Sequence, residues 1–558
     1  MVILPTEVMI RQIWETATHR TFEIAALEEF FIESLNVLGI PALRTAPLQP
    51  LDALSLRPRH QSARKSYPTG ITQSMSLSPM TRRQLLALAG GAPFAAAAAE
   101  AIPLDIRAFG ALGDGRHDDT EAIQKAIDKA SVGRGVVSIP PCNVSQGKYW
   151  RITRPLFLRS NVSVIGQGVN SLLYNDRKES TTFMDQAVVL PGNYHPEFLN
   201  TIEFDTARII DQSKGIIAVA NTSARYSSGQ TVFVRSQDYD RTRPAVSISS
   251  LTTICRVITV RPDTIVVDRS IQFNGPVVVA PADEQVRWRP VGPPSNCFVC
   301  INSSLENLAI RSEGFWTGDT AARGCKFTNL WIQSRVGIYG NLFQECHWKN
   351  IHLTFDRLAI ELACNSTDVV VEGLYAKMSG DPESPIHQII AIQESAMRCI
   401  VRDFFIDADA FTKTAPVVRF GPSSHCVISG GKILCKQARG TMISFDTGAA
   451  QVVHNRVRDV EFHANSGAVG IAFEPRQNGE VSNNQVDNVR IEGLTMAVAA
   501  RIGGTSNTIS NCRLTGNKVV VLPSAANCVV RDSSIPGRID LSGPQSESVN
   551  FLRNETRR

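Results

Sequence analysis

The stretch that decides the fold runs FGALGDGRHDDTEAIQKAI, from Phe109 to Ile127. Gly113 and Gly115 suit a tight turn, because glycine adopts positive φ without steric cost. Asp118 and Glu121 form the pattern of a helix capping box. One apolar helical face follows, made of Ile123, Ile127 and Ala130. Such a helix would cover the open end of a strand solenoid, so we interpret Asp118 and its neighbour Asp119 as cap residues and not as a catalytic pair.

This stretch resembles the opening of β-helix proteins of the pectate lyase superfamily, a group with rhamnogalacturonase-like and epimerase-like enzymes and some phage tailspikes. Three further segments are similar to the first coils of that family: Gly135–Pro141, Tyr149–Ile152 and Leu156–Gly168. The resemblance implies an all-β protein, a single-stranded right-handed parallel β-helix with an N-terminal capping helix and a small β insertion. It is specific for the fold and says little about the reaction.

A short pattern then returns along the chain from about residue 296, with a period of roughly 20 to 30 residues, as in stacked solenoid coils. The clearest copies are Cys325–Ile332, Cys346–Leu353, Cys399–Phe404 and Cys426–Gly431. A β-propeller would also give many short strands. Its blade motifs of roughly forty residues are missing from the sequence, which favours the solenoid.

The cysteines fit the same repeat. The chain has 12 of them, and Cys325, Cys346, Cys399 and Cys426 share one inward-facing position of the coil. Buried free cysteine behaves as a small hydrophobic residue, so we expect free thiols and not disulfides. Cys297 and Cys300 form a lone CxxC, without the second pair that would indicate a zinc site.

The segment from 80 to 99 has the parts of an export signal. Arg82 and Arg83 precede a short apolar run and an alanine tract, an order that looks like a twin-arginine (Tat) signal. The alternative is a buried amphipathic helix, but the alanines lack helical periodicity. Because export signals begin near the N-terminus, we expect translation to start at Met75 or Met80. The predicted location is periplasmic or secreted, with the Tat translocase as a partner during export.

Composition and charge set the remaining limits. Charged residues make up 20% and hydrophobic residues 43% of the 558 residues, which is typical of a globular protein. The net charge of +5 is too small to indicate nucleic acid as a partner, and no apolar run suggests a membrane helix. We therefore expect the following organisation: 1–79 a non-native or disordered extension, 80–99 the signal, 100–199 the cap and first coils, 200–290 a small β insertion with hairpin strands, and 291–558 the main coils.

Catalytic groups of a β-helix come from successive coils and line one surface. A hydrolase needs two carboxylates. A lyase must neutralise the uronate carboxylate, with calcium or arginine, before the adjacent proton can leave. The polar region 352–425 supplies the candidate catalytic residues, which are Asp381, Glu383, Arg402, Asp407, Asp409 and His425.

These candidates differ in their setting. Asp381 and Glu383 lie in a longer loop, where binding groups are often found. Asp407 and Asp409 follow a strand ending at Ile406 on one face, as a carboxylate pair or half of a calcium site. The alternative reading for each of them is a solvated charge or a turn residue.

The reaction stays open at this stage. Polygalacturonase-like hydrolases carry the elements Asp-Asp, Gly-His-Gly and Arg-Ile-Lys, and the sequence lacks this set. Arg501-Ile502-Gly503 matches only the first two residues of the third element. The main hypothesis is an exported polysaccharide lyase or glycoside hydrolase acting on an acidic, pectin-like or uronate-containing polysaccharide. Calcium is expected only for a lyase. The alternative is a non-catalytic glycan-binding or surface β-helix protein.

Overall fold

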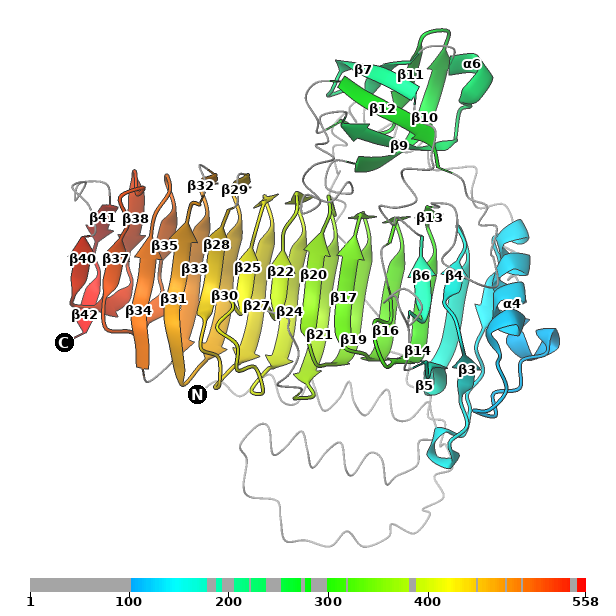
Figure 1. The fold of residues 1–558 in the computed structure, drawn as a ribbon, viewed down its shortest axis with the longest axis horizontal. Helices are drawn as coiled ribbons and strands as arrows, with labels where there is room; N and C mark the ends of the chain where they lie inside the picture. Colours follow the sequence, from blue (N-terminus) through cyan, green and yellow to red (C-terminus); the bar gives the residue numbers. More distant parts are fainter. Residues whose placement is uncertain are drawn as a thin grey trace, which may run out of the picture. The chain divides into compact units, whose positions relative to one another are not determined.

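The computed structural model describes the chain between residues 102 and 557, with internal gaps. The described residues are 102–177, 187–192, 205–219, 222–236, 252–271, 276–282, 299–317, 320–380, 388–447, 450–476, 479–492, 495–541 and 549–557. They form a right-handed parallel β-helix with one N-terminal helix and one inserted β-barrel (Figure 1). The predicted fold class is confirmed. The predicted extension 1–79 and signal 80–99 lie outside the described residues.

Each coil contributes a strand to an 18-stranded parallel sheet, which we call sheet 1. Its strands are β1 (Leu104–Asp105), β2 (Val136–Ser138), β3 (Trp150–Ile152), β5 (Ser163–Asn175), β14 (Ser304–Ser312), β16 (Lys326–Gln333), β19 (His347–Phe355), β21 (Val370–Met378), β24 (Ile400–Asp407), β27 (Val427–Leu434), β30 (Arg456–His463), β33 (Gln485–Glu492), β35 (Thr508–Ser510), β36 (Arg513–Leu514), β38 (Cys528–Arg531), β39 (Ser534–Pro536), β41 (Val549–Leu552) and β42 (Glu555–Arg557). Adjacent strands lie about 4.8 Å apart, so equivalent side chains of successive coils form rows.

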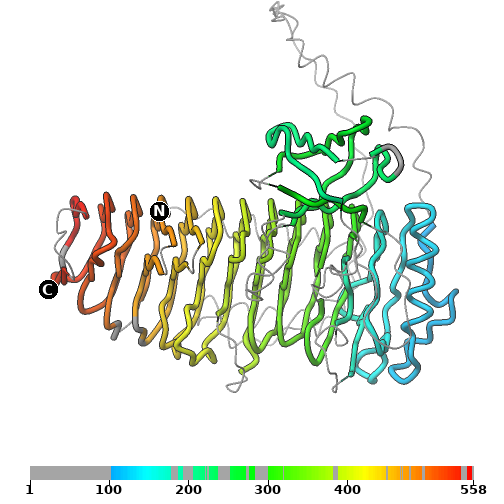
Figure 2. Tube along the Cα trace, turned by 45° about the horizontal axis from the view of Figure 1, so that its top comes forward, coloured from blue at the N-terminus to red at the C-terminus, as the bar shows by residue number. Residues whose placement is uncertain are grey.

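Two further sets of parallel strands complete each coil. The trace in Figure 2 shows the coils stacked one after another. Sheet 2 consists of β17 (Val336–Asn341), β20 (Leu358–Ala363), β22 (Ile390–Ile392), β25 (Val418–Phe420), β28 (Thr441–Asp446), β31 (Ser466–Glu474), β34 (Thr495–Ile502), β37 (Val519–Val521) and β40 (Ile539–Leu541). Sheet 3 consists of short strands in two groups, which isolated bridges from Thr367 to Gln344 and Met397 connect. The first group is β13 (Cys300–Ile301), β15 (Ala322–Arg323) and β18 (Phe343–Gln344), and the second is β23 (Ala396–Met397), β26 (Ser423–Ser424), β29 (Gln451–Val453) and β32 (Glu480–Ser482). In chain order each coil passes through sheet 3, sheet 1 and sheet 2.

Residues with positive φ recur at two places in the coil. One lies in the turn from sheet 3 to sheet 1, at Asn302, Glu345, Asp368, Arg398, His425, His454, Asn483, Ser506 and Asn527. The other interrupts the sheet 1 strands, at Asn307, Asn329, Asn350, Asp403, Asp459, Asn488, Asn511 and Asp532. Asn, Asp and His tolerate this conformation better than most residues, which explains the polar turn signals in the sequence.

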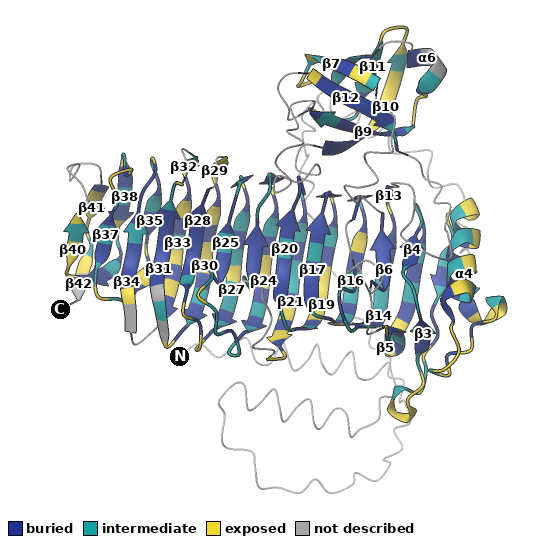
Figure 3. Cartoon of the chain, viewed as in Figure 1, coloured by how far each residue is buried: buried dark blue, intermediate teal, exposed yellow. Residues whose placement is uncertain are grey.

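Buried residues recur along the strands of the solenoid (Figure 3). The position after the first of these turns is buried, and its residue type changes along the solenoid. The early coils place Cys325, Cys346, Cys399 and Cys426 there, each at most 1% exposed. Later coils place Asn455, Asn484 and Asn507 there, fully or almost fully buried and joined amide to amide. All described cysteines are free, as predicted. Burial raises the pKa of the Cys346 and Cys426 thiols.

The N-terminal end of the solenoid carries helix α4 (Thr120–Gly133), whose Ile123, Ala126, Ile127 and Ala130 are buried. The two aspartates before it both accept main-chain hydrogen bonds from nearby residues. Asp119 is buried and accepts hydrogen bonds from the main-chain N–H groups of Leu112 and Gly113, at 2.7 and 3.1 Å. Asp118 accepts from the N–H of Thr120 at 3.0 Å. The predicted capping box is wrong in detail, because Glu121 pairs with Lys125 one turn further along.

Between the paired strands β4 (Leu156–Leu158) and β6 (Val189–Pro191) and the main coils, the chain forms a closed antiparallel barrel. Its strands are β7 (Asp205–Asp211), β8 (Ile216–Val219), β9 (Thr231–Ser236), β10 (Thr252–Arg261), β11 (Thr264–Val267) and β12 (Pro276–Pro281). The barrel has a hydrophobic core of its own. This is the small β insertion of the predicted fold.

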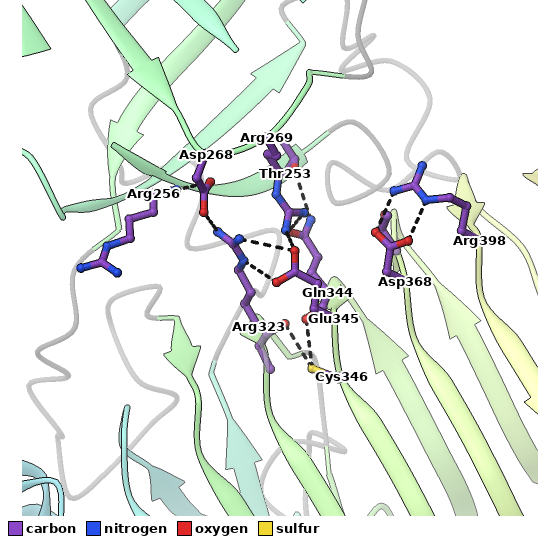
Figure 4. A network of polar contacts seen from close by, with 12 residues as sticks. Thr253, Arg256, Asp268, Arg269, Arg323, Gln344, Glu345, Cys346, Asp368 and Arg398 are labelled. Atoms are coloured by element: carbon purple, nitrogen blue, oxygen red, sulfur yellow. Dashed lines mark hydrogen bonds and ion pairs between the residues drawn. The ribbon is translucent and has the colours of Figure 1, made fainter. Parts of the chain in front are cut away.

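Polar groups join the barrel to the coils (Figure 4). Arg323 of the β-helix contacts Asp268 of the barrel at 2.6 Å, and Arg269 of the barrel contacts Glu345 of the β-helix. Arg323 also contacts Glu345 at 3.1 Å. The barrel and the β-helix thus each provide one arginine and one carboxylate to the same network of ion pairs.

Candidate functional site

The predicted catalytic residues do not gather at one place. Asp381 and Glu383 lie outside the described residues. Asp407 ends β24 and accepts from the main-chain N–H of Asp409 at 3.2 Å. Asp409 in turn contacts the Lys436 ammonium at 2.8 Å, and this ion pair raises the lysine pKa. The two aspartates are therefore neighbours, and their roles in catalysis stay predictions.

Arg402 and His425 lie on different parts of the coil. Arg402 points outward from sheet 1 and pairs with Glu372 on the preceding coil. That ion pair lowers the Glu372 pKa. His425 occupies the turn before sheet 1 with a φ of 57°, and its ring stacks on His454 at 4.8 Å. Burial, followed by the charges of His454 and Arg398, lowers the His425 pKa.

A different set of charged residues converges on the outer face of sheet 2. These residues, which we call the carboxylate row, occupy two neighbouring register positions of the sheet. Glu361, Arg419 and Arg501 share one position, and Gln393, Asp446 and Glu474 lie two residues further along the chain on their coils. Arg419 lies between two partners, contacting Gln393 at 3.0 Å on one side and Asp446 at 2.8 Å on the other. Gln393 donates to Glu361 at 2.5 Å. The row thus links β20, β25 and β28 by side-chain contacts.

Asp446 and Glu474 are the two carboxylates that the fold brings closest along this row. They are register partners on β28 and β31, so their main chains lie about 4.8 Å apart. The Asp446 side chain is 7% exposed and accepts two hydrogen bonds from Arg419 and one from Ser444. Glu474 is 15% exposed and contacts Arg501 and Arg476. Two anchored carboxylates therefore face the same side of sheet 2.

Arg501 was named from the sequence and Glu361 was covered by the polar region 352–425, but Asp446 and Glu474 were missed. The missed signal is a phenylalanine followed by an acid, at Phe445-Asp446 and again at Phe473-Glu474. Phe420, Phe445 and Phe473 stack inside the solenoid, with ring centroids 4.8 Å apart in each pair. Phenylalanines that stack inside the solenoid fix how neighbouring coils align. The residue that follows each of them therefore points outward, and these outward residues are aligned from coil to coil.

One further group of potential metal ligands lies on sheet 1, made of Glu461, His463 and Glu492. The imidazole contacts Glu461 through Nε2 at 3.1 Å and Glu492 through Nδ1 at 3.6 Å, so the carboxylates lie at different ring nitrogens. Arg490 already pairs with Glu492 at 2.6 Å. Calcium prefers oxygen ligands throughout, so an imidazole between two paired carboxylates does not fit a calcium site.

Comparisons with known proteins found one matching family and several similar solved structures. Residues 104–240 match the family described as rhamnogalacturonase A/epimerase, pectate lyase-like. Among solved structures, the surface adhesin PfbA of Streptococcus pneumoniae has 13% identity and a TM-score of 0.42, covering 81% of this chain and 98% of PfbA.

Two further solved structures are similar to this chain at about the same level of identity. The tailspike of E. coli bacteriophage HK620, solved with a pentasaccharide, has 11% identity and a TM-score of 0.44, covering 79% of this chain and 67% of the tailspike. The A-module of the mannuronan C-5 epimerase AlgE4 of Azotobacter vinelandii has 12% identity and a TM-score of 0.38, covering 81% and 95%. The chain is thus a right-handed parallel β-helix protein that is similar, over residues 104–240, to pectate-lyase-like proteins of the rhamnogalacturonase A/epimerase family.

Proposed function

We propose that the protein is a carbohydrate-active enzyme that cleaves an acidic polysaccharide on the outer face of sheet 2. The observation that carries this proposal is the pairing of Asp446 with Glu474 across adjacent coils, each held by an arginine. The similarity of the first coils to a family named after a rhamnogalacturonase and an epimerase supports a glycan as the substrate.

Glycoside hydrolysis is the reaction that this pair suits best. Retaining hydrolases use two carboxyl groups about 5–5.5 Å apart, one as nucleophile and one as acid and base. Neighbouring parallel strands give a similar spacing of about 4.8 Å. We assign the nucleophile to Asp446, which Arg419 and Ser444 hold in place, and the acid–base role to the more exposed Glu474.

Elimination is the second candidate reaction, because arginines share the row with the carboxylates. A uronate carboxylate must be neutralised before the neighbouring carbon can lose its proton. Arg419 and Arg501 point outward from the same face and would supply this positive charge. Hydrolysis and elimination leave different products, so the product itself distinguishes them.

Non-catalytic glycan binding is the competing function, and one observation favours it. Asp446 and Glu474 are both already paired with arginine, and Glu361 with Gln393. An enzyme must release or share one of these contacts during turnover. A binding protein would keep all of them as a fixed polar surface.

The test measures turnover on polygalacturonate, rhamnogalacturonan, alginate and glycosaminoglycans, each with calcium or chelator. Release of reducing ends without ultraviolet absorbance indicates hydrolysis, and both signals together indicate a lyase. We expect Asp446→Asn and Glu474→Gln to lower kcat at least a hundredfold, the usual effect of losing acid–base catalysis.

Two controls sharpen the result. Asp540→Asn removes an ion-paired carboxylate of the same sheet, bound to Lys518 at 2.6 Å, and should leave kcat unchanged. Asp407→Asn tests the site predicted from sequence. A loss of activity in Asp407→Asn with full activity in Asp446→Asn would move the site to sheet 1 and refute the assignment.

We also propose export to the periplasm or the medium through the twin-arginine-like segment. None of the helices among the described residues is long and apolar enough to cross a membrane. N-terminal sequencing of the native protein tests this proposal. A mature start near Glu100 would support it, and a start before Met75 would contradict it.

A further inference from the structure

We infer that the outer face of sheet 1 carries a second glycan-binding track, separate from the carboxylate row. Its centre is an aromatic ladder, formed by Trp331, His352, Tyr375 and Phe405 in register on β16, β19, β21 and β24. Successive ring centroids lie 5.7, 6.1 and 5.4 Å apart. The ladder spans three strand spacings, about 14 Å, which accommodates a short oligosaccharide.

The rings are accessible. Tyr375 is 49% exposed, His352 is exposed, and the other two rings are half-buried. The Trp331–His352 planes differ by 9° and the Tyr375–Phe405 planes by 15°. Parallel rings in contact lie about 3.5–4.0 Å apart, so the longer centroid distances mean that the rings are offset sideways. The exposed parts of these rings are where the C–H face of a sugar can pack.

The polar groups around the ladder are also available. Among the described residues, the side-chain hydrogen-bonding groups of Trp331, His352 and Tyr375 have no partner, and the same holds for the adjacent row. That row consists of Gln333, Thr354 and Lys377. On later coils the equivalent surface is occupied by its own ion pairs, such as Lys432 with Glu461. Free polar groups beside aromatic rings are typical of ligand sites.

Charge indicates what kind of glycan fits. The outward side chains of β16, β19, β21 and β24 include four basic residues, Lys326, Lys349, Lys377 and Arg402, and three acids, Glu372, Asp403 and Asp407. Glu372 is already paired with Lys349 and Arg402, whereas Lys326 and Lys377 form no ion pair among the described residues. This surplus of positive charge favours a polysaccharide that carries carboxylates. The inference rests on the proposed function only in this choice of ligand, since binding on sheet 1 does not require cleavage on sheet 2.

If the aromatic ladder only stabilised the sheet, the expected results would differ. Cross-strand aromatic pairs stabilise a sheet by themselves, so their removal would lower stability without changing affinity for a ligand. The two roles separate when affinity and stability are measured on the same variants.

The test measures binding of the full chain to polygalacturonate and to alginate by affinity electrophoresis, with uncharged dextran for comparison. Trp331→Thr with Tyr375→Thr keeps residues of high β-propensity in the strands. We expect this double variant to lose roughly tenfold or more in affinity for the acidic glycans. Lys377→Gln should weaken binding to them without affecting dextran. Tyr149→Thr, which removes a ring from a pair on the first coils, is the matched control.

The outcomes are distinct. Unchanged affinity in a folded Trp331→Thr/Tyr375→Thr variant would overturn the inference. An equal loss in Tyr149→Thr, or a change from oligomer to monomer in the ladder variant, would also overturn it. Ladder-dependent binding without turnover on any glycan would uphold the track and refute the proposed enzyme. Loss of turnover in Asp446→Asn with binding retained would support both the glycan-binding track on sheet 1 and the proposed active site on sheet 2.

Discussion

The buried asparagines of the later coils offer a sharp test of what holds the solenoid together. In Asn484→Ala, the main-chain N–H of Asn455 loses its acceptor, the Asn484 Oδ1 atom at 3.0 Å. The side-chain amide of Asn455 also loses its bond to Asn484 Oδ1 at 3.2 Å, and the amide nitrogen of Asn484 no longer donates to the Val452 carbonyl at 2.8 Å or to Asn507 at 3.1 Å. All three asparagine side chains lie in the core, so water does not replace these bonds.

The expected cost follows from these contacts. A buried N–H without an acceptor costs about 2 kcal/mol, and each of the three lost side-chain amide bonds costs about 1 kcal/mol. The sum is about 5 kcal/mol in the free energy of unfolding. Cys426→Ala is the matched control, because Cys426 occupies the same position two coils earlier and is equally buried. Its loss removes one sulfur atom and should cost about 1 kcal/mol.

Urea denaturation gives the difference in stability, and hydrogen exchange at the Asn455 amide gives the local effect. Solenoid coils interact mainly with their neighbours, so the exchange rate should rise around Asn455 and not in the first coils. A stability loss in Asn484→Ala no larger than in Cys426→Ala would refute the reasoning. So would an unchanged exchange rate at Asn455.

Two further predictions concern charge. The pKa of His425 is lowered in the folded protein, so its contribution to stability is complete above its ordinary value of 6.5 and is lost as the pH falls below it. His425→Asn, which keeps a residue tolerant of positive φ, should flatten the thermal-melting profile between pH 7 and about 5, and an unchanged slope would contradict this. Arg323→Leu removes the arginine shared by Asp268 and Glu345 and should speed limited proteolysis of the barrel severalfold, as should high salt in the wild-type protein. Equal proteolysis rates would show that other contacts hold the barrel.

The fold was predictable because its signals are local and repeated. The turn and helix of 109–127, the recurrent cysteine position and the asparagine turns each mark one coil, and together they indicate a solenoid. The free thiols were predictable for the same reason. The confirmed helix face of Ile123 and Ile127 needed only the helical period.

The candidate site was harder to predict, because two features break the alternation of strand residues. In sheet 2 the N–H groups of Ala359 and Ile360 both donate to the carbonyl of Ile389, so both residues are buried in succession. This bulge shifts Glu361 to the outer face. Leu358 packs in a small cluster outside the main core, so strict alternation from Leu358 would have placed Glu361 inside.

Sheet 1 has an equivalent shift at Asn350, whose positive φ interrupts β19. Strict alternation from the buried Trp348 would place His352 inside, although it is exposed. The rows of both outer faces therefore emerge only when the coils are stacked. No single strand of the sequence contains them.

The enclosed thiols have one more consequence, for how the protein can be studied. Ten of the described cysteines are buried and Cys142 alone is half-buried, so the sulfur atoms are distributed along the core of the solenoid and one lies in the barrel. A thiol reagent can reach most of them only after the coil that holds them has opened. Mass spectrometry of labelled peptides would then report which coils open first. The wild-type chain contains these reporters already, without any engineered label.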